Sequence, residues 1–338
     1  MQPCSARRFR RRPTCAMLGY GSEGWISNGL ASEMQSARHM PSQGKLAALL
    51  RLTRWREHVP FTIPLTVVGG LLAVEPAAAA VDWRLIMVLA GNALAMSFAF
   101  MINDIEDAPD DARDPAKRAH NVISSGLLSR REGQLATAAA GILAFLLFAA
   151  AGAYTLLLGA IMLALCYLYS AHPFRFKARP LTDVVSHALM LSGLIVATGF
   201  FAYDRAPGAV WLVIAAASLF SAYGQFYNQV ADFNVDQQAG LRNTAALLGV
   251  GLTSLLGHAS IALALVCMVA AILQGLFPVW LGTILLLGAF TCLLFPWEMD
   301  MRGNLAQDGG NMQRPGLIVA NLAALCWLAS NLGWLTIM

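Results

Sequence analysis

The sequence contains few charged residues and lacks the cysteine and nucleophile patterns that mark many catalytic sites. Only 12% of its 338 residues are charged, whereas a soluble domain carries about 25%. The six cysteines form no CxxC pair and no Cys/His ligand spacing, so we expect them to pack as small apolar residues. No Ser/His/Asp or Cys/His set stands out either, which is consistent with chemistry that needs no covalent enzyme intermediate.

Long apolar stretches dominate the rest of the chain. Hydrophobic residues make up 57% of it and the mean hydropathy is +0.58, which indicates a membrane protein that crosses the bilayer several times. Open strands cannot span lipid, and most of the stretches approach the ~20 residues that a spanning helix needs. We therefore expect an all-α membrane protein with nine transmembrane helices, the third and fourth joined by a tight turn near Gly152. The stretches are 59–78, 82–103, 134–152, 154–171, 183–203, 208–229, 248–273, 277–296 and 315–337.

Basic residues lie in alternate loops, and the positive-inside rule places those loops in the cytoplasm. The opposite loops hold only Arg84 and Arg205. We therefore expect a cytoplasmic N-terminus, an external C-terminus and a location in the bacterial inner membrane. The basic loop residues are Arg113, Lys117, Arg118, Arg130, Arg131, Arg175, Lys177, Arg179, Arg242, Arg302 and Arg314.

Residues 1–45 differ from the remainder. They are rich in Arg and contain no apolar core region, so they do not read as a secretory signal. A transit peptide, a disordered tail and a start assigned too early, with Met40 as the real start, are all compatible with them. We expect residues 46–338 to form the membrane domain and assign no function to the leader.

The pattern Asn-x-x-x-Asp-x-x-x-Asp occurs twice, each time where an apolar stretch ends. A spacing of four places such residues on one helix face, and two facing acidic clusters repel unless a hard cation lies between them. Carboxylate and amide oxygens suit Mg²⁺, which often binds few protein ligands together with substrate phosphates. The pair of motifs therefore predicts a Mg²⁺-diphosphate site at a membrane surface. The copies are Asn103, Asp107 and Asp111, and Asn228, Asp232 and Asp236.

The two copies are expected to differ in regularity. Pro109 disfavours helix at Ala108 and removes a backbone donor, so Asp111 is expected on a loop beyond the helix that carries Asn103 and Asp107. The second copy contains no proline and is expected to be the more regular helix.

Two further polar segments carry basic residues near membrane ends. The first runs from Tyr169 to Lys177 and includes Arg175; the second contains Arg242, beyond a turn at Gly240. Both Arg and Lys suit phosphate oxygens, although ordinary positive-inside charge explains such residues equally well. We interpret His172 as a loop histidine rather than a ligand. The polar turn 121–126 does not by itself indicate a function.

Together these segments resemble the UbiA-type intramembrane prenyltransferases. The resemblance covers about residues 46–338 and rests on NDxxDxxxD after the second span, YSxxPxRxK after the fourth and NxxxDxxxDxxxG after the sixth. It implies a bundle of helices around a central cavity, capped by cytoplasmic loops, with an apolar tunnel open to lipid. It also implies transfer of a prenyl group from an isoprenoid diphosphate to a lipophilic acceptor, such as an aromatic or quinone precursor, a pigment or a lipid.

The resemblance implies roles for individual residues as well. Asp107, Asp232 and Lys177 would be catalytic. The metal ligands would be Asn103, Asp104, Asp107, Asp111, Asn228, Asp232 and Asp236. The diphosphate would contact Asn103, Asn228, Arg175, Lys177, Lys117, Arg118, Arg242 and Tyr169. The lipid bilayer is the expected surroundings, and no nucleic acid partner is expected.

The chain departs from the quinone-pathway members in the loop after the first motif. Those members carry an Arg-Thr and Arg-Pro series, whereas this loop reads Arg118-Ala-His-Asn-Val-Ile-Ser-Ser-Gly, closer to the lipid- and pigment-type branches. That difference argues against 4-hydroxybenzoate as the acceptor. A membrane terpene cyclase would use the same diphosphate chemistry. A cation-coupled transporter would place polar residues near the midplane, and the carboxylates here lie at span ends on one side.

Overall fold

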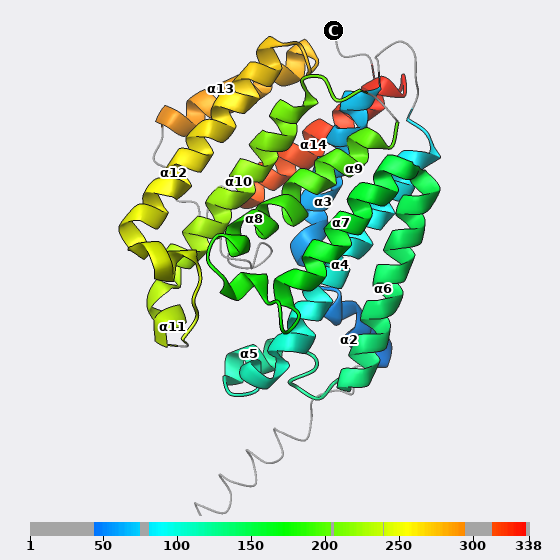
Figure 1. Ribbon diagram of the computed structural model, residues 1–338. Helices are drawn as coiled ribbons and strands as arrows, with labels where there is room; N and C mark the ends of the chain where they lie inside the picture. Colours follow the sequence, from blue (N-terminus) through cyan, green and yellow to red (C-terminus); the bar gives the residue numbers. More distant parts are fainter. Residues whose placement is uncertain (1–43, 75–80, 204–205, 239, 295–312, 336–338) are drawn as a thin grey trace, which may run out of the picture. The chain divides into compact units, whose positions relative to one another are not determined.

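The computed structural model describes residues 44–74, 81–203, 206–238, 240–294 and 313–335. Residues 1–43 of the basic leader lie outside the described residues, so the expectation for 1–45 stays a prediction. Every described element is a helix, as expected from the composition (Figure 1). All of them from Lys45 onward belong to one compact unit.

A helix occurs at each of the nine apolar stretches within the described part of the chain. Six of these helical segments, from α4 to α12, are long and apolar enough to cross a membrane, which makes the chain an integral membrane protein; that all nine cross it stays a prediction. The segments are α3 (Trp55–Ala73), α4 (Trp83–Asp111), α6 (Arg130–Ala151), α7 (Ala153–Ser170), α8 (Thr182–Ala188) continuing through η2 (Leu189–Gly193) into α9 (Leu194–Phe201), α10 (Val210–Ala231), α12 (Thr244–Leu273), α13 (Val279–Leu294) and α14 (Gln313–Asn331).

Local sequence explains where several helices begin and end. The Asp82 side chain accepts a hydrogen bond from Arg84 N at the start of α4, and Ser129 and Glu132 form a capping box at the start of α6. Gly152, at φ 148°, forms the tight turn between α6 and α7 that the sequence predicts. This backbone region suits glycine alone.

Close packing joins α3 to α9. A Cβ atom on Gly69 would collide with the Val196 carbonyl, and one on Gly199 with the Thr66 carbonyl. Beside this contact, Asn92 of α4 donates to Thr66 Oγ1 at 2.9 Å and accepts from Thr198 Oγ1 at 3.0 Å. All three polar side chains are fully buried, so the pairing satisfies groups that would be costly to leave unpaired.

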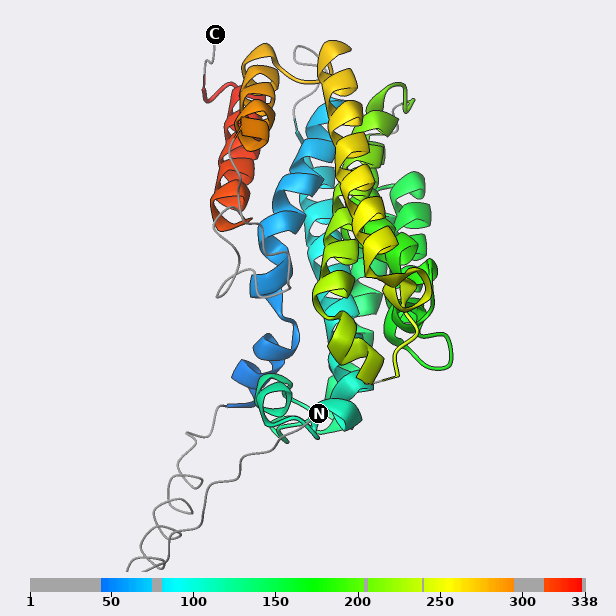
Figure 2. The same ribbon diagram turned by 90° about the vertical axis from the view of Figure 1, so that its left-hand side faces the viewer.

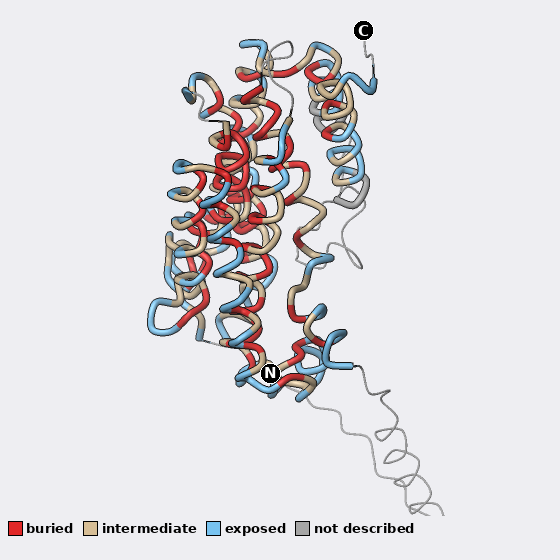
Figure 3. The backbone as a smooth tube through the Cα atoms, turned by 90° about the vertical axis from the view of Figure 1, so that its right-hand side faces the viewer, coloured by how far each residue is buried: buried red, intermediate tan, exposed pale blue. Residues whose placement is uncertain are grey.

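Buried residues gather between the helices, and exposed residues lie on the outer faces (Figure 3). Many of the exposed side chains are large and apolar. On α6 the outward side chains include Leu135 and Ile142, and on α12 they include Leu255. Apolar residues facing outward along long helices match a lipid-facing surface.

Four short helices lie near one end of the bundle. They are α2 (Lys45–Leu52), α5 (Pro115–His120), η1 (Phe176–Ala178) and α11 (Phe233–Gln238). Figures 1 and 2 place α2, α5 and α11 at the same end, where α4 and α10 also end. Both acidic motifs therefore lie at this end of the bundle.

The expected difference in regularity between the two acidic motifs is wrong. Helix α4 continues through Pro109 to Asp111. Donors from the following loop support its last turns, because Asn121 Nδ2 bonds to the Asp104 carbonyl at 2.8 Å and Ser124 Oγ to the Ala108 carbonyl at 2.9 Å.

The second motif is the interrupted one. Helix α10 ends at Ala231, Asp232 lies at the turn with φ −95° and ψ 6°, and α11 then begins at Phe233. Short polar side chains such as Asp and Asn compete for backbone groups and favour helix ends. No outside donor comparable with Asn121 supports this turn among the described residues.

Candidate functional site

Two basic residues lie against the first acidic motif. Lys177 Nζ donates to Asn103 Oδ1 at 2.7 Å and to Asp107 Oδ2 at 2.5 Å. Arg175 Nη2 donates to Asp107 Oδ1 at 3.1 Å and lies 3.8 Å from Asp110 Oδ2. The structure thus brings together predicted residues that are separated by about seventy positions in the sequence.

The chain between α7 and α8 positions these cations. Ser170, the last residue of α7, donates to Asn103 Oδ1 at 3.3 Å. Arg175 adopts a left-handed backbone with φ 42°, which is uncommon for a residue other than glycine. Tyr169 points inward, where its hydroxyl accepts a long hydrogen bond from Gln225 Nε2 at 3.5 Å.

Burial alters the Lys177 ammonium. Burial lowers the pKa of Lys177 below its ordinary value, while the Asp107 carboxylate opposes the shift. The ion pair compensates the desolvation of both groups, and a phosphate oxygen is a second kind of partner that could do so.

The other acidic residues of the first motif have different partners. Arg54 Nη1 lies 3.3 Å from Asp104 Oδ1 and also forms a close pair with Glu57. Asp104 is 3% exposed, so it faces protein rather than the loop side. Asp111 accepts a hydrogen bond from Asn121 Nδ2 at 2.9 Å.

The second motif has far fewer partners. Asp232 is exposed, and Asp236 accepts a hydrogen bond from Asn243 Nδ2 at 2.7 Å. Burial and the nearby Asp232 charge raise the pKa of Asp236 above its ordinary value. Asn228 Oδ1 is buried without a hydrogen-bond partner within the described residues.

Three predicted diphosphate ligands lie on the surface. Lys117 and Arg118 are exposed on α5, and Arg242 is exposed just after the turn at Gly240, where φ is 70°. Within the part of the chain that the structure describes, none of the three contacts Asp107 or Asn228, so their roles as diphosphate ligands stay predictions.

Sequence reasoning missed two groups of polar residues inside the bundle. Asp183 is fully buried and bonds to Gln229 and Thr244. His187 Nδ1 lies 3.2 Å from Ser221 Oγ, and its ring lies 6.3 Å from that of Tyr169. Asp183 and His187 open an apolar stretch, so the pattern identified them only as a span boundary.

The oxygen donors at this end of the bundle fit a hard divalent cation. Within the described ranges, no three His, Cys, Asp or Glu side chains gather closely enough to hold a metal ion by themselves. Mg²⁺ commonly takes one or two carboxylates and completes its coordination with water and phosphate. The unpaired amide oxygen of Asn228 and the exposed carboxylate of Asp232 are donors of that kind.

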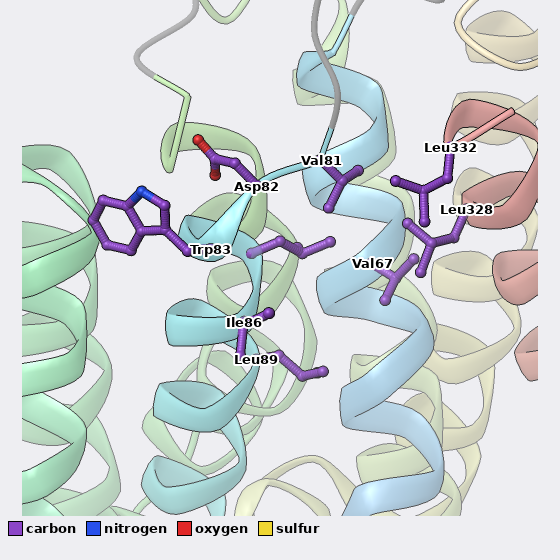
Figure 4. A pocket seen from close by; sticks show the side chains of 9 residues that line it. Val67, Val81, Asp82, Trp83, Ile86, Leu89, Leu328 and Leu332 are labelled. Carbon is purple, nitrogen blue, oxygen red and sulfur yellow. The ribbon is translucent and has the colours of Figure 1, made fainter.

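An apolar pocket lies at the opposite end of α4, away from the acidic motifs (Figure 4). Its volume is about 400 Å³, and its lining comes from the start of α4, from α3 and from the end of α14. It is therefore not part of the candidate site. The lining residues are Val67, Val81, Asp82, Trp83, Leu85, Ile86, Leu89, Leu328 and Leu332.

Comparisons with known proteins match the chain to a single family. The model of the UbiA prenyltransferase family matches residues 62–305. Lycopene elongase/hydratase of Haloferax volcanii is 34% identical over 154 residues, which is 45% of this chain and 48% of that protein. The match thus spans about half the length of that curated relative. 4-Hydroxybenzoate octaprenyltransferase of Salmonella paratyphi C is 28% identical over 270 residues, 79% of this chain and 89% of that protein.

A solved structure shares the fold. The structure of a UbiA homolog from Archaeoglobus fulgidus bound to GPP and Mg²⁺ superposes with a TM-score of 0.64. The match covers 87% of this chain and 100% of that chain at 23% sequence identity. At this identity the likeness establishes the arrangement of helices.

Proposed function

Because the chain belongs to the UbiA prenyltransferase family, we propose that it transfers a prenyl group from an isoprenoid diphosphate to a lipophilic acceptor and releases pyrophosphate. The observation that carries this proposal is the contact of Lys177 and Arg175 with Asn103 and Asp107. These cations and the acidic motifs lie at one end of an apolar helix bundle, where a diphosphate head and a prenyl tail need opposite surroundings. Homologues bound to GPP or DMAPP with Mg²⁺ support the proposal.

The acidic residues and asparagines of both motifs would hold Mg²⁺. The ion, when bound, neutralises diphosphate charge and stabilises the leaving group. On the second motif, Asn228, Asp232 and Asp236 offer oxygens with few competing partners. On the first, Asn103, Asp107 and Asp111 would contribute, with Asp104 behind them; Asp107 is at present paired with two cations.

The basic residues would exchange partners when the substrate binds. Lys177 and Arg175 now compensate Asp107, and the same donors can turn to diphosphate oxygens. There they would stabilise the negative charge that develops on pyrophosphate as the allylic C–O bond breaks. An electron-rich carbon of the acceptor then bonds to C1 of the prenyl group, and the acceptor loses a proton.

The acceptor we favour is a pigment or another neutral lipid. The loop after the first motif lacks the Arg-Thr and Arg-Pro series of quinone-pathway members, and one curated relative is a lycopene elongase/hydratase. The interior polar residues near Tyr169 include His187, Ser221 and Gln225 together with the Asp183 carboxylate. A buried carboxylate repels an anionic group, so these surroundings suit an acceptor without a carboxylate.

A transfer assay tests the proposal. Purified protein is incubated with labelled geranylgeranyl diphosphate, with and without a membrane lipid extract, and with 4-hydroxybenzoate in a parallel sample. Transfer requires the label in a heavier product that depends on the extract. If the label leaves as a hydrocarbon or simple terpene alcohol equally fast without extract, the protein is a terpene cyclase instead.

We also propose that the site faces the cytoplasm of a bacterial inner membrane, with the N-terminus on the same side. The charge asymmetry of the loops supports this orientation. Single cysteines at positions 82 and 118, in a variant without native cysteines, distinguish the two faces. An impermeant reagent should label position 82 from outside and leave 118 unlabelled; the reverse result would place the site on the wrong face for cytosolic diphosphates.

A further inference from the structure

Asp183 is a fully buried carboxylate that belongs to neither acidic motif. It accepts four hydrogen bonds: from its neighbour Val184 N at 2.8 Å, from Gln229 Nε2 at 2.7 Å, from Thr244 N at 2.7 Å and from Thr244 Oγ1 at 2.5 Å. No cation pairs with it among the described residues. Its charge is balanced by hydrogen-bond donors alone, an arrangement that stabilises a carboxylate well inside a protein.

These donors come from separate helices. Asp183 lies in the first turn of α8, Gln229 in the last turn of α10, and Thr244 begins α12. Gln229 Oε1 in turn accepts from Ala245 N at 2.9 Å, and Leu181 N donates to Thr244 Oγ1 at 2.8 Å. The start of α8 therefore fastens the end of α10 to the beginning of α12, and α10 packs against both (Figure 1).

In the sequence, these two joined helix ends flank the second acidic segment, which we define as residues 230–238 and 240–243. It contains Asp232, Asp236 and Arg242, and Asn228 directly precedes Gln229 at its start. Among the described residues of the segment, one side-chain hydrogen bond reaches an acidic residue, from Asn243 Nδ2 to Asp236. Backbone hydrogen bonds in and beside α11 shape the segment locally, so its ends chiefly determine where it lies rather than its internal geometry.

Asp183 also lies close in sequence to Lys177 and Arg175, the basic residues that contact the first acidic motif. Five residues lie between it and Lys177, and hydrogen bonds hold this intervening chain. Asp183 N bonds to the Arg179 carbonyl at 3.1 Å, and Thr182 Oγ1 bonds to the Phe176 carbonyl at 3.2 Å. A displacement of Asp183 would therefore change the positions of both Lys177 and the second acidic segment.

We propose that Asp183 is a positioning residue that clamps the second acidic segment and fixes its place relative to Lys177 and Arg175. The clamp itself is independent of the activity, while its consequence for Mg²⁺ and diphosphate binding rests on the proposed function. Replacing the carboxylate by an amide turns one acceptor into a donor that faces the existing donors of Gln229 and Thr244. Asp183→Asn should therefore open the clamp with little change in volume.

Limited trypsin digestion measures the clamp directly. Arg242 is the sole Lys or Arg in residues 230–243, so the fragment cut after it reports on this segment. Cleavage of an opened segment follows the population of the open form. Loss of a hydrogen bond to a buried charge should raise the rate of this cut about tenfold in Asp183→Asn, in the purified full-length protein.

Thr198→Val is the matched control. It removes a buried hydrogen bond to Asn92 in the distant α3–α4–α9 core and should lower the melting temperature without changing the Arg242 cut. If Asp183→Asn does not fold, Thr244→Val and Thr244→Ser replace it. The valine removes one donor to Asp183 and should speed the cut, while the serine retains both donors and should not.

The second measurement separates positioning from general stability. Asp183→Asn should raise the Mg²⁺ concentration for half-maximal activity and the KM for the prenyl diphosphate more than it lowers kcat; Thr198→Val should change neither constant. Unchanged cleavage at Arg242 in folded Asp183→Asn would overturn the clamp. If wild-type protein binds no prenyl diphosphate while the cleavage difference holds, the clamp stands and the proposed function fails.

Discussion

The two acidic segments share a spacing but differ in how their charges are balanced. At the end of α4, Asp107 contacts Lys177 and Arg175, and Asp104 contacts Arg54. Each of these cations is itself partly or largely removed from solvent. Basic residues of the protein itself therefore pair with Asp104 and Asp107 of the first segment.

The second segment lacks this compensation. No ion pair to Asp232 or Asp236 is found among the described residues, and the amide oxygen of Asn228 has no partner. An added cation would gain most here because it displaces no protein cation. The difference teaches that repeated spacing does not imply equivalent surroundings. The first segment has carboxylates paired with cations, which we propose as phosphate ligands, and the second has open oxygens, which we propose as metal ligands.

Removal of divalent cations should have the largest effect. If the second segment depends on a bound cation, prenyl transfer should be abolished by EDTA and restored by added Mg²⁺. The check is a titration of activity in purified membranes against Mg²⁺ at fixed diphosphate concentration. Full activity in EDTA would remove the proposed distinction between the segments.

Substitution of either central aspartate should reduce transfer strongly. Asp107→Ala and Asp232→Ala should each lower activity by at least the ~10²–10³-fold seen when one electrostatic group at a developing charge is lost. Asp232 has no protein cation beside it in the part of the chain that the structure describes, so we expect its loss to affect metal binding more. Excess Mg²⁺ should therefore restore less activity in Asp232→Ala than in Asp107→Ala. Single-turnover rates over a range of Mg²⁺ concentrations measure both effects, and a near-wild-type Asp232→Ala enzyme contradicts the metal assignment.

The long helices and the pairing of the first motif with the YSxxPxRxK segment were predictable. Apolar length decides the position of each helix, and motif order together with the resemblance placed Lys177 and Arg175 near Asp107. The phosphate role that the resemblance implies for these cations stays a prediction, and in the structure they bind the aspartate. Both assignments use the same donors, so the residues could be found without knowing which acceptor they contact.

Other features depend on contacts that no local pattern records. Proline at 109 predicts a break, yet Asn121 and Ser124 support the helix from a loop that follows it. Asp183 looks like the polar edge of an apolar stretch, and its partner Thr244 is 61 residues away. Likewise, Arg54 contacts Asp104 only because the fold brings them together from 50 positions apart. A single sequence carries no signal for such tertiary pairs.

The stability of metal-free protein should separate the segments. Asp107→Ala leaves Lys177 and Arg175 without their carboxylate and should lower the free energy of unfolding by about 1–3 kcal/mol. Asp232→Ala removes an exposed carboxylate without an ion pair among the described residues and should stay within about 0.5 kcal/mol of wild type. Thermal unfolding in EDTA and detergent shows which variant loses more stability. Equal losses of unfolding free energy in the two variants would show that the ion pairs of the first segment do not stabilise the protein.

The smallest effect concerns the pH dependence of the second segment. Burial and the Asp232 charge raise the pKa of Asp236 above its ordinary 3.8, so between 3.8 and the raised value the folded state binds more protons than the unfolded state. The stabilising contribution of this proton is fully present below 3.8 and is lost as pH rises through the raised pKa. Asp232→Asn removes the neighbouring charge, so the pKa of Asp236 should rise less. The pH range over which this stabilising contribution is lost should then be narrower. Melting temperatures of wild type and Asp232→Asn, measured in EDTA from pH 3.8 upward, should therefore diverge within the window, wild type losing stability over the wider range. If the melting temperatures of the two proteins changed with pH at identical slopes, the two carboxylates would not interact. The second segment would then hold its charges too far apart to share one cation.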